Sequence, residues 1–412
     1  MCKKRIIALI AVCGIMLTGC KVEYSEETLP SSTAINEATS KTIRVRYSDE
    51  SYKEYFEYCE TLFETEHSDT DVILDLVSSE NYVENIGSDS LSGTDVPDVY
   101  LIENSELGTA YLAGLAAKNT VDKFNSENYC DTAINACSCN GNLIGYPLGF
   151  KTSFLAYNTD FLTADNVKTF AALEEYSDNA TFSQEDAAEI ETIFRCNITE
   201  LFANYGFVGS NINTGGTYGD DTSKVDINNG NIKSDAEKYL SIIDYFSLNP
   251  KASSSWCAKN FVAGKFLSTI YTTDYLGSLS KAQINYEIAE FPDYDNENST
   301  APLSITSALA VNPYASDIEL AKEFAEFATY QTAEEFYNYV KLPSARKGVK
   351  YETEQFKNIY ASYEKSVPKN KLQYGDQIYP LVEIALHNIA AGEDIEGEFK
   401  KIDDYMKDQI SN

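Results

Sequence analysis

Carboxylates are the most abundant groups in this sequence that could do chemistry. Asp and Glu total 64 of the 412 residues against 32 Lys and Arg, which sets the formal charge at −32. Only two histidines are present, and no G-x-S-x-G, H-E-x-x-H, Walker or G-x-G-x-x-G motif occurs. With this many acids, no single carboxylate pair identifies a glycosidase. We therefore predict a protein that is not an enzyme and has no metal site and no cofactor. The charge also argues against nucleic acid as a partner, because nucleic acid is a polyanion.

Thiols and tyrosines are the other side chains of chemical interest. Disulfides are possible among six cysteines in the body of the chain, with connectivity left open: Cys59, Cys130, Cys137, Cys139, Cys196 and Cys257. Cys59 falls on an apolar helix face, which favours a core position. The 30 tyrosines combine a flat apolar face with a polar tip, so they suit a recognition surface as well as a core.

Hydrophobic spacing predicts the elements that position these groups. Strands are expected at 43–47, 72–77 and 99–102, with helices at 52–63 and 80–91 between them. This order predicts right-handed βαβ units and a parallel sheet, in which ligands gather at the carboxyl ends of strands. Polar groups stand at two such ends, namely Ser48 and Asp49 at one, and Glu103 and Asn104 at the other. We predict that these four side chains contact a ligand; ordinary turn capping is the alternative.

Later segments favour helices. Capping-box motifs at 234–237, 316–319 and 332–335 predict three helix starts. Apolar stripes over 378–389 and 395–406 predict two more helices, and residues 209–222 form a loop rich in Gly, Asn and Asp.

The first residues read as a targeting segment. A basic start is followed by an apolar run over 6–17, too short to cross a bilayer and typical of a signal peptide. Leu17-Thr-Gly-Cys20 resembles the lipobox of bacterial lipoproteins. That resemblance implies a signal peptide at 1–19, lipid attachment at Cys20, and a polar flexible linker over 20–40. The protein is then expected at the extracytoplasmic face of the cell membrane, attached by lipid only. An ordinary signal peptide with an incidental cysteine is the alternative.

One segment carries a family resemblance. Residues 141–158, GNLIGYPLGFKTSFLAYN, resemble the corresponding stretch of extracellular solute-binding proteins of the maltose-binding type. Further stretches at 97–102, 261–270, 303–311 with 320–327, and 342–346 resemble the same family in the same order.

The resemblance implies an α/β fold of two lobes, of the periplasmic-binding-protein type II class, with a ligand cleft between them. Three chain crossings form its hinge, carried to 150–153, 290–293 and 342–345. One lobe would comprise 41–150 plus 291–345, and the other 151–290 plus 346–412. Such proteins close around a ligand, mostly a sugar or oligosaccharide, and present it to the permease of an ABC transporter. A monomer is expected.

The same resemblance points to cleft residues. Tyr271, Asp274 and Tyr275 follow the 261–270 segment where the family places cleft aromatics, although Asp274 replaces an aromatic of maltose binders. For Tyr271 and Tyr275, packing beneath the cleft is the alternative. Lys151 stands where maltose binders carry a carboxylate; an ion pair with Glu103 or Asp274 is its structural alternative. Arg346 follows the third crossing and is a further candidate.

Two other functions are weighed against import. A lipid-anchored glycan-active enzyme would need two carboxylates facing across a subsite. A surface adhesin or sensor would bind sugar without transporting it. The lone Trp256 is expected to pack within a lobe.

Overall fold

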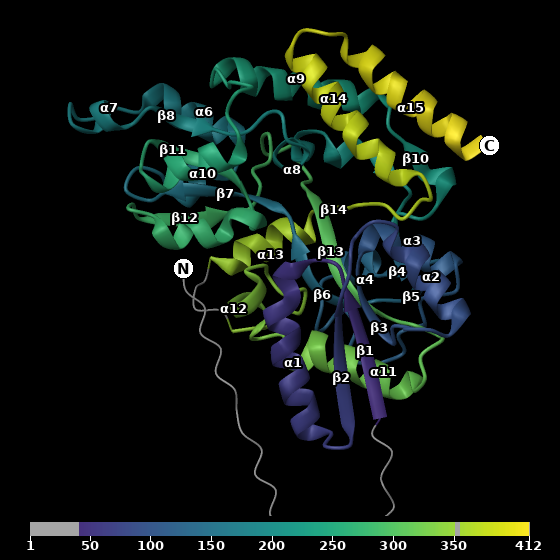
Figure 1. The fold of residues 1–412 in the computed structure, drawn as a ribbon. Coiled ribbons are helices and arrows are strands. Elements are labelled where there is room, and N and C mark those ends of the chain that lie inside the picture. The colour runs from purple at the N-terminus through teal and green to yellow at the C-terminus, as the bar shows by residue number, and fades with distance from the viewer. Residues whose placement is uncertain (1–40, 351–354, 412) are drawn as a thin grey trace, which may run out of the picture. The chain divides into compact units, whose positions relative to one another are not determined.

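Two mixed β-sheets organise the chain in the computed structural model, which describes residues 41–350 and 355–411. The first sheet has the strand order β14-β13-β3-β1-β2, and β6 also pairs with β13. In this sheet β1 runs parallel to β2 and β3, which confirms the predicted parallel units, whereas β13 runs antiparallel to β3 and β6 (Figure 1). The strands are β1 (Lys41–Tyr47), β2 (Thr70–Leu76), β3 (Val99–Glu103), β6 (Tyr146–Lys151), β13 (Leu303–Val311) and β14 (Val367–Pro368).

Helices with one apolar face cover the first sheet. On α1, residues Tyr55, Phe56, Cys59 and Phe63 are buried, because positions three and four apart share one side of a helix. α1 contacts β2, and α11 contacts β3 and β13. The elements of this part are η1 (Glu50–Tyr52), α1 (Lys53–Glu66), α2 (Tyr82–Ser92), α3 (Asn104–Leu112), α4 (Asp131–Ala136), β4 (Ser138–Cys139), β5 (Asn142–Leu143), α11 (Ile318–Glu326), the π-helical turn η6 (Phe327–Gln331) and α12 (Phe336–Val340).

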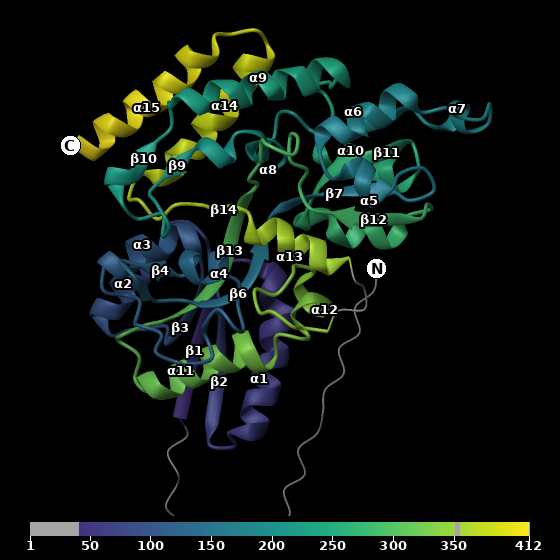
Figure 2. The same ribbon diagram turned by 180° about the vertical axis from the view of Figure 1, so that it is seen from behind.

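The second sheet has the order β12-β7-β11-β8 and its own hydrophobic core. Its strands are β7 (Ser153–Asn158), β8 (Thr192–Arg195), β11 (Phe266–Thr272) and β12 (Tyr286–Ala289). The predicted C-terminal helices are confirmed as α14 (Ile378–Ala390) and α15 (Ile395–Ser411), which contact each other and α9 (Figure 2). The remaining elements are α5 (Ala164–Val167), α6 (Phe170–Asn179), α7 (Asp186–Glu189), α8 (Leu201–Asn204), η2 (Tyr205–Phe207), η3 (Gly209–Asn211), β9 (Asn213–Thr214), η4 (Thr222–Lys224), β10 (Val225–Asp226), α9 (Gly230–Tyr245), α10 (Ser254–Val262), η5 (Thr273–Lys281), α13 (Phe356–Glu364) and η7 (Gly375–Gln377).

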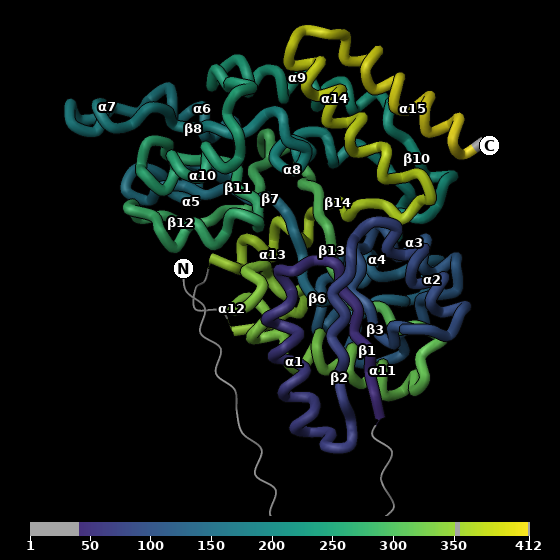
Figure 3. Tube along the Cα trace, in the orientation of Figure 1, coloured from purple at the N-terminus to yellow at the C-terminus, as the bar shows by residue number. Residues whose placement is uncertain are grey.

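The chain passes between the two sheets at Thr152, where β6 of the first sheet leads into β7 of the second (Figure 3). Thr152 is fully buried, and its hydroxyl donates to the carbonyl of Leu303, 3.1 Å away, where β13 begins. Ser304 Oγ accepts a hydrogen bond from Ser366 Oγ at 2.7 Å. Three stretches far apart in sequence therefore meet at one place, as the two-lobe fold requires.

The second passage lies later than the sequence predicted. Asp293 bridges to Thr169, and Phe291 and Tyr294 belong to the second core. Residues 291–302 therefore stay with the second sheet, and the chain returns to the first sheet only at β13. The reason is packing, since the rings of Phe291 and Phe207 lie 5.6 Å apart.

Some local predictions need correction. The helix expected from the motif at 234–237 begins at Gly230 instead, because Asn229 accepts hydrogen bonds from the backbone amides of the first turn. The third motif opens no helix at Thr332, whose hydroxyl donates to the carbonyl of Phe327. The six body cysteines are buried free thiols in this structure, and burial raises the pKa of Cys59 and Cys137 to about 12. Among the helices described, none is long and apolar enough to cross a membrane.

Candidate functional site

A hollow of 290 Å³ lies at the carboxyl ends of β1, β2 and β3. We call it the strand-end pocket. Parallel strands bring their carboxyl ends to one edge of a sheet, which is why side chains distant in sequence converge here. The lining is mostly polar and comprises Ser48, Asp49, Tyr52, Ser79, Tyr82, Leu101, Ile102, Glu103, Ser105, Glu106, Lys151, Ser307, Lys369 and Asp376.

Four of the predicted site residues line this pocket: Ser48, Asp49, Glu103 and Lys151. Asp49 caps the turn η1, because its carboxylate accepts a hydrogen bond from the amide of Ser51 at 2.9 Å. Asp49 therefore has both roles: it caps the turn, which was the alternative, and it lines the pocket.

Lys151 ends β6 and faces an acid of the other lobe. Its Nζ lies 3.6 Å from Oδ1 of Asp274 in η5, and the two side chains are 25% and 48% exposed. The acidic partner foreseen for Lys151 is thus Asp274. A half-exposed pair of this kind contributes roughly 0–1 kcal/mol to stability, so Lys151 keeps hydrogen-bonding capacity for another acceptor.

Two buried tyrosines line the pocket. The hydroxyl of Tyr52 donates to Ser307 Oγ at 2.8 Å, and that of Tyr82 donates to the carbonyl of Arg46 at 3.1 Å. Tyr52 is 2% exposed and Tyr82 5%, so packing and these hydrogen bonds fix the orientation of both rings. Tyr52 and Tyr82 belong to the helices predicted at 52–63 and 80–91, but neither was predicted to line a pocket. The usable signal was their position, since each follows the end of a strand by a few residues.

Three charged residues of the pocket were also not predicted from the sequence: Glu106, Lys369 and Asp376. Burial raises the pKa of Glu106 to about 7, and repulsion by Glu103 and Asp376 adds to the shift while Lys369 opposes it. Glu106 could have been found, because it stands three residues after Glu103 on the helix that follows β3. No sequence signal marks Lys369 and Asp376, since tertiary contacts alone bring 369–376 to this edge.

The predicted ligand contact of Asn104 needs correction, because this side chain lies behind the pocket. It is fully buried; its amide nitrogen donates to the carbonyl of Lys369 at 2.6 Å, and its oxygen accepts from the amide of Thr306 at 2.8 Å. Gly108 allows the same close approach, since a Cβ there would lie 2.3 Å from the carbonyl oxygen of Lys371. Asn104 and Gly108 hold α3 against the segment that carries Lys369.

Three further predicted contacts lie outside the strand-end pocket. Tyr271 is buried on β11, its hydroxyl lies 2.8 Å from Ser278 Oγ, and its ring packs against those of Phe154 and Phe261. Arg346 donates to the carbonyl of Tyr330 at 2.7 Å and stacks on that ring at 4.1 Å, which holds it away from the pocket. Tyr275 is half-buried against the core and does not line the pocket.

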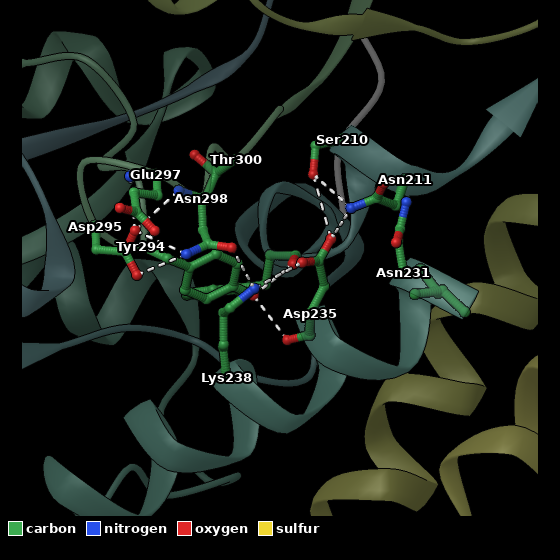
Figure 4. Close-up of polar contacts among 12 residues, drawn as sticks. Ser210, Asn211, Asn231, Asp235, Lys238, Tyr294, Asp295, Glu297, Asn298 and Thr300 are labelled. Atoms are coloured by element: carbon green, nitrogen blue, oxygen red, sulfur yellow. Dashed lines mark hydrogen bonds and ion pairs between the residues drawn. The ribbon is translucent and has the colours of Figure 1, made fainter. Parts of the chain in front are cut away.

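A second hollow of 520 Å³ adjoins the first through Lys369. The loop rich in Gly and Asn forms most of its wall, with Asn135 and Ala136 opposite. Figure 4 shows how this loop is anchored: buried Asp235 of α9 accepts hydrogen bonds from Asn211 at 2.6 Å and Ser210 at 3.3 Å. Lys238 links the same carboxylate to Asn298. The loop is therefore a fixed wall of the second lobe.

Comparison with known proteins identifies the family. A family model described as bacterial extracellular solute-binding protein matches residues 61–362. The maltodextrin-binding protein MdxE of Bacillus subtilis (strain 168) is 24% identical over 379 residues, covering 88% of this chain and 88% of that protein. A maltooligosaccharide ABC transporter solute-binding lipoprotein of Streptococcus pneumoniae is 22% identical, covering 78% of this chain and 75% of its own length.

Solved structures of solute-binding proteins share the fold. A solved extracellular solute-binding protein from Staphylococcus aureus, in complex with maltose, superposes with a TM-score of 0.78 at 16% identity. The match covers 90% of this chain and 98% of that one. With a family match over most of its length and a two-lobe α/β fold, the chain belongs to the bacterial extracellular solute-binding proteins.

Proposed function

We propose that this protein captures a sugar or oligosaccharide in the strand-end pocket and delivers it to the permease of an ABC importer. The observation that carries the proposal is the pocket's composition at a lobe boundary. Hydroxyl and carboxylate groups of the first lobe stand beside Lys151, whose ion-pair partner Asp274 belongs to the second lobe. Relatives named for maltodextrin and maltooligosaccharide binding support a carbohydrate ligand.

The proposed ligand contacts are Ser48, Asp49, Glu103, Lys151 and Asp274. The carboxylates and the Ser48 hydroxyl can accept hydrogen bonds from sugar hydroxyls, and Lys151 can donate to sugar oxygens. Asp274 stands where maltose binders carry an aromatic, so the ring stacking of that subgroup is not reproduced at this position. Tyr275, from the same turn, is proposed to reach the ligand only as the lobes close.

Closure is proposed to occur about the meeting point of the crossings, in a monomer. The two lobes would be 41–151 with 303–345, and 152–302 with 346–412, with the short strand β14 staying beside β13. Phe150 and Tyr363 support a hinge here, because their rings stack at 3.8 Å across the first crossing and both are fully buried. A packed pivot lets the flanking lobes rotate as rigid bodies.

Sugar binding is expected to raise thermal stability and to compact the protein. The purified mature chain would be screened by thermal shift against mono- and oligosaccharides. A ligand at a hundredfold excess over its Kd stabilises by about 2.7 kcal/mol. Small-angle scattering should then show a smaller radius of gyration, and the sugar should be recovered intact. Turnover of the sugar would instead move the protein to the glycan-active enzymes, and an unresponsive panel would contradict a carbohydrate ligand.

Lipid attachment at Cys20 is proposed as the membrane anchor. This residue lies outside the described residues, and support comes from the lipobox-like sequence and from a relative named as a lipoprotein. In Cys20→Ala, the protein is expected to appear in the medium or to remain unprocessed, because one modified residue holds it at the membrane. Fractionation with immunoblotting measures this, with Cys59→Ala as the control cysteine. Full membrane retention of Cys20→Ala contradicts a lipid anchor.

A further inference from the structure

The single tryptophan of the chain lies in a hollow of its own, away from the strand-end pocket. Trp256, in the first turn of α10, is 42% exposed, although lobe packing was the expectation for it. Its ring contacts that of Phe266 at 5.1 Å on one side, which leaves the rest of the indole open. The hollow measures 380 Å³, within the roughly 300–1,000 Å³ usual for small-molecule sites. Its lining consists of Arg195, Ser247, Asn249, Lys251, Ala252 and Trp256.

The charge of this hollow is opposite to that of the protein. Two of its six lining residues are cationic and none is acidic, in a chain whose acids outnumber its bases 64 to 32. Among the described residues, no carboxylate forms an ion pair with Arg195 or Lys251. The amino end of α10 also opens here, and the partial positive charge of a helix start adds to the potential. The site therefore attracts an anion.

The turn that lines this hollow is held by hydrogen bonds. Arg195 Nη1 donates to the carbonyl of Ser247 at 2.6 Å, which fixes the guanidinium at the hollow. Ser247 adopts a φ of 48°, in the left-handed region that residues other than glycine rarely occupy. The backbone amide of Lys251 donates to Asn249 Oδ1 at 2.9 Å, which orders the turn that carries the second cation. The hollow therefore has one fixed guanidinium and an ordered turn that bears an exposed lysine.

We propose that this hollow is an accessory carbohydrate site that takes a carboxylated pyranose, a hexuronate unit of an acidic glycan. The exposed indole offers a flat apolar surface to the C–H face of the ring. Arg195 and Lys251 meet the carboxylate with charge-assisted hydrogen bonds, which a neutral sugar cannot form. The site shares no residue with the strand-end pocket, so it binds independently of the transported ligand.

Intrinsic fluorescence tests the proposal directly, because Trp256 is the only tryptophan in the sequence. Titration of the mature chain with trigalacturonate is expected to change the emission in a saturable way. Maltotriose, inorganic phosphate and acetate are expected to produce at most a weak change at the same concentrations. Saturation by phosphate at the same Kd would reduce the site to a plain anion site, and equal binding of maltotriose would remove the role of charge; either result overturns the proposal.

Charge variants locate the binding. Arg195→Gln and Lys251→Gln are each expected to raise the Kd for trigalacturonate about tenfold, since each removes one charge-assisted hydrogen bond. Lys251 is exposed, so its variant keeps the fold even if Arg195→Gln does not. The matched control is Lys259→Gln. Lys259 is exposed and lies on α10 with Trp256 but outside the hollow, so this variant should leave the Kd unchanged. The absence of any saturable change, or an equal loss in Lys259→Gln, overturns the proposal.

Discussion

Replacing Lys151 with methionine is expected to weaken sugar binding roughly ten- to a hundredfold, the loss typical of one charge-assisted hydrogen bond. Lys151 lines the strand-end pocket, and its ion pair with Asp274 is long, at 3.6 Å. Methionine keeps the apolar stem and removes the three donors and the charge. Calorimetric titration with a sugar that stabilises the wild type measures the change in Kd.

The comparison variant is Asp274→Asn, which removes the charge of the partner, leaves the lysine in place, and keeps an amide oxygen that can still accept a hydrogen bond from the ligand. If Lys151 donates to the ligand, this variant should bind far better than Lys151→Met. Thermal stability without ligand should change little in either variant, because a half-exposed ion pair contributes only about 0–1 kcal/mol. Unchanged affinity with a lower melting temperature in Lys151→Met would make the lysine structural and remove it from the site.

Glu106→Gln is expected to stabilise the ligand-free protein at pH 8 by about 1–3 kcal/mol, with no gain below pH 5. The pKa of Glu106 is raised from 4.5 to about 7, first by burial and then by Glu103, Asp376 and Glu84. Lys369 opposes the rise. The folded state therefore keeps a proton that the unfolded state has lost between these pH values.

This extra proton sets the direction in which stability changes with pH. Because the folded state binds more protons, stability falls as pH rises from about 4.5 to about 7, and the penalty persists above pH 7. Glutamine carries no charge, so the variant avoids the penalty and its stability curve separates from that of the wild type across this range. Urea unfolding at several pH values measures the difference. Glu80→Gln, which changes an exposed acid just before α2, is the control. Parallel curves for wild type and Glu106→Gln would contradict a raised pKa.

The local pattern of the sequence was enough to predict the first half of the fold. Apolar alternation over 43–47 and the helical stripe from Tyr55 to Phe63 reappear as β1 and α1 with the expected faces buried. Such patterns succeed because burial of a periodic apolar face is decided within one element. The polar residues at the strand ends could be predicted for the same reason, and Ser48, Asp49 and Glu103 do line the pocket.

The burial of charged side chains could not be predicted from the sequence. In the alternation over 43–47, Arg46 falls on the face opposite the apolar residues, yet it is 5% exposed and bonded to Asp75 at 2.8 Å and Asp89 at 2.6 Å. Both acids lie about thirty or more positions away, and a buried cation depends on carboxylates that only the folded chain brings to it. No window of sequence contains that information.

The family resemblance and the strand ends together identified a two-lobe solute-binding fold from the sequence alone. Tertiary structure decided which side chains share the pocket. Lys369 and Asp376 arrive there because Asn104 and Gly108 let α3 press against their segment, while Tyr271 and Arg346 satisfy their polar atoms elsewhere. The physical reason is that secondary structure follows from neighbours a few residues apart, whereas a binding site is assembled by contacts between segments that are adjacent only after folding.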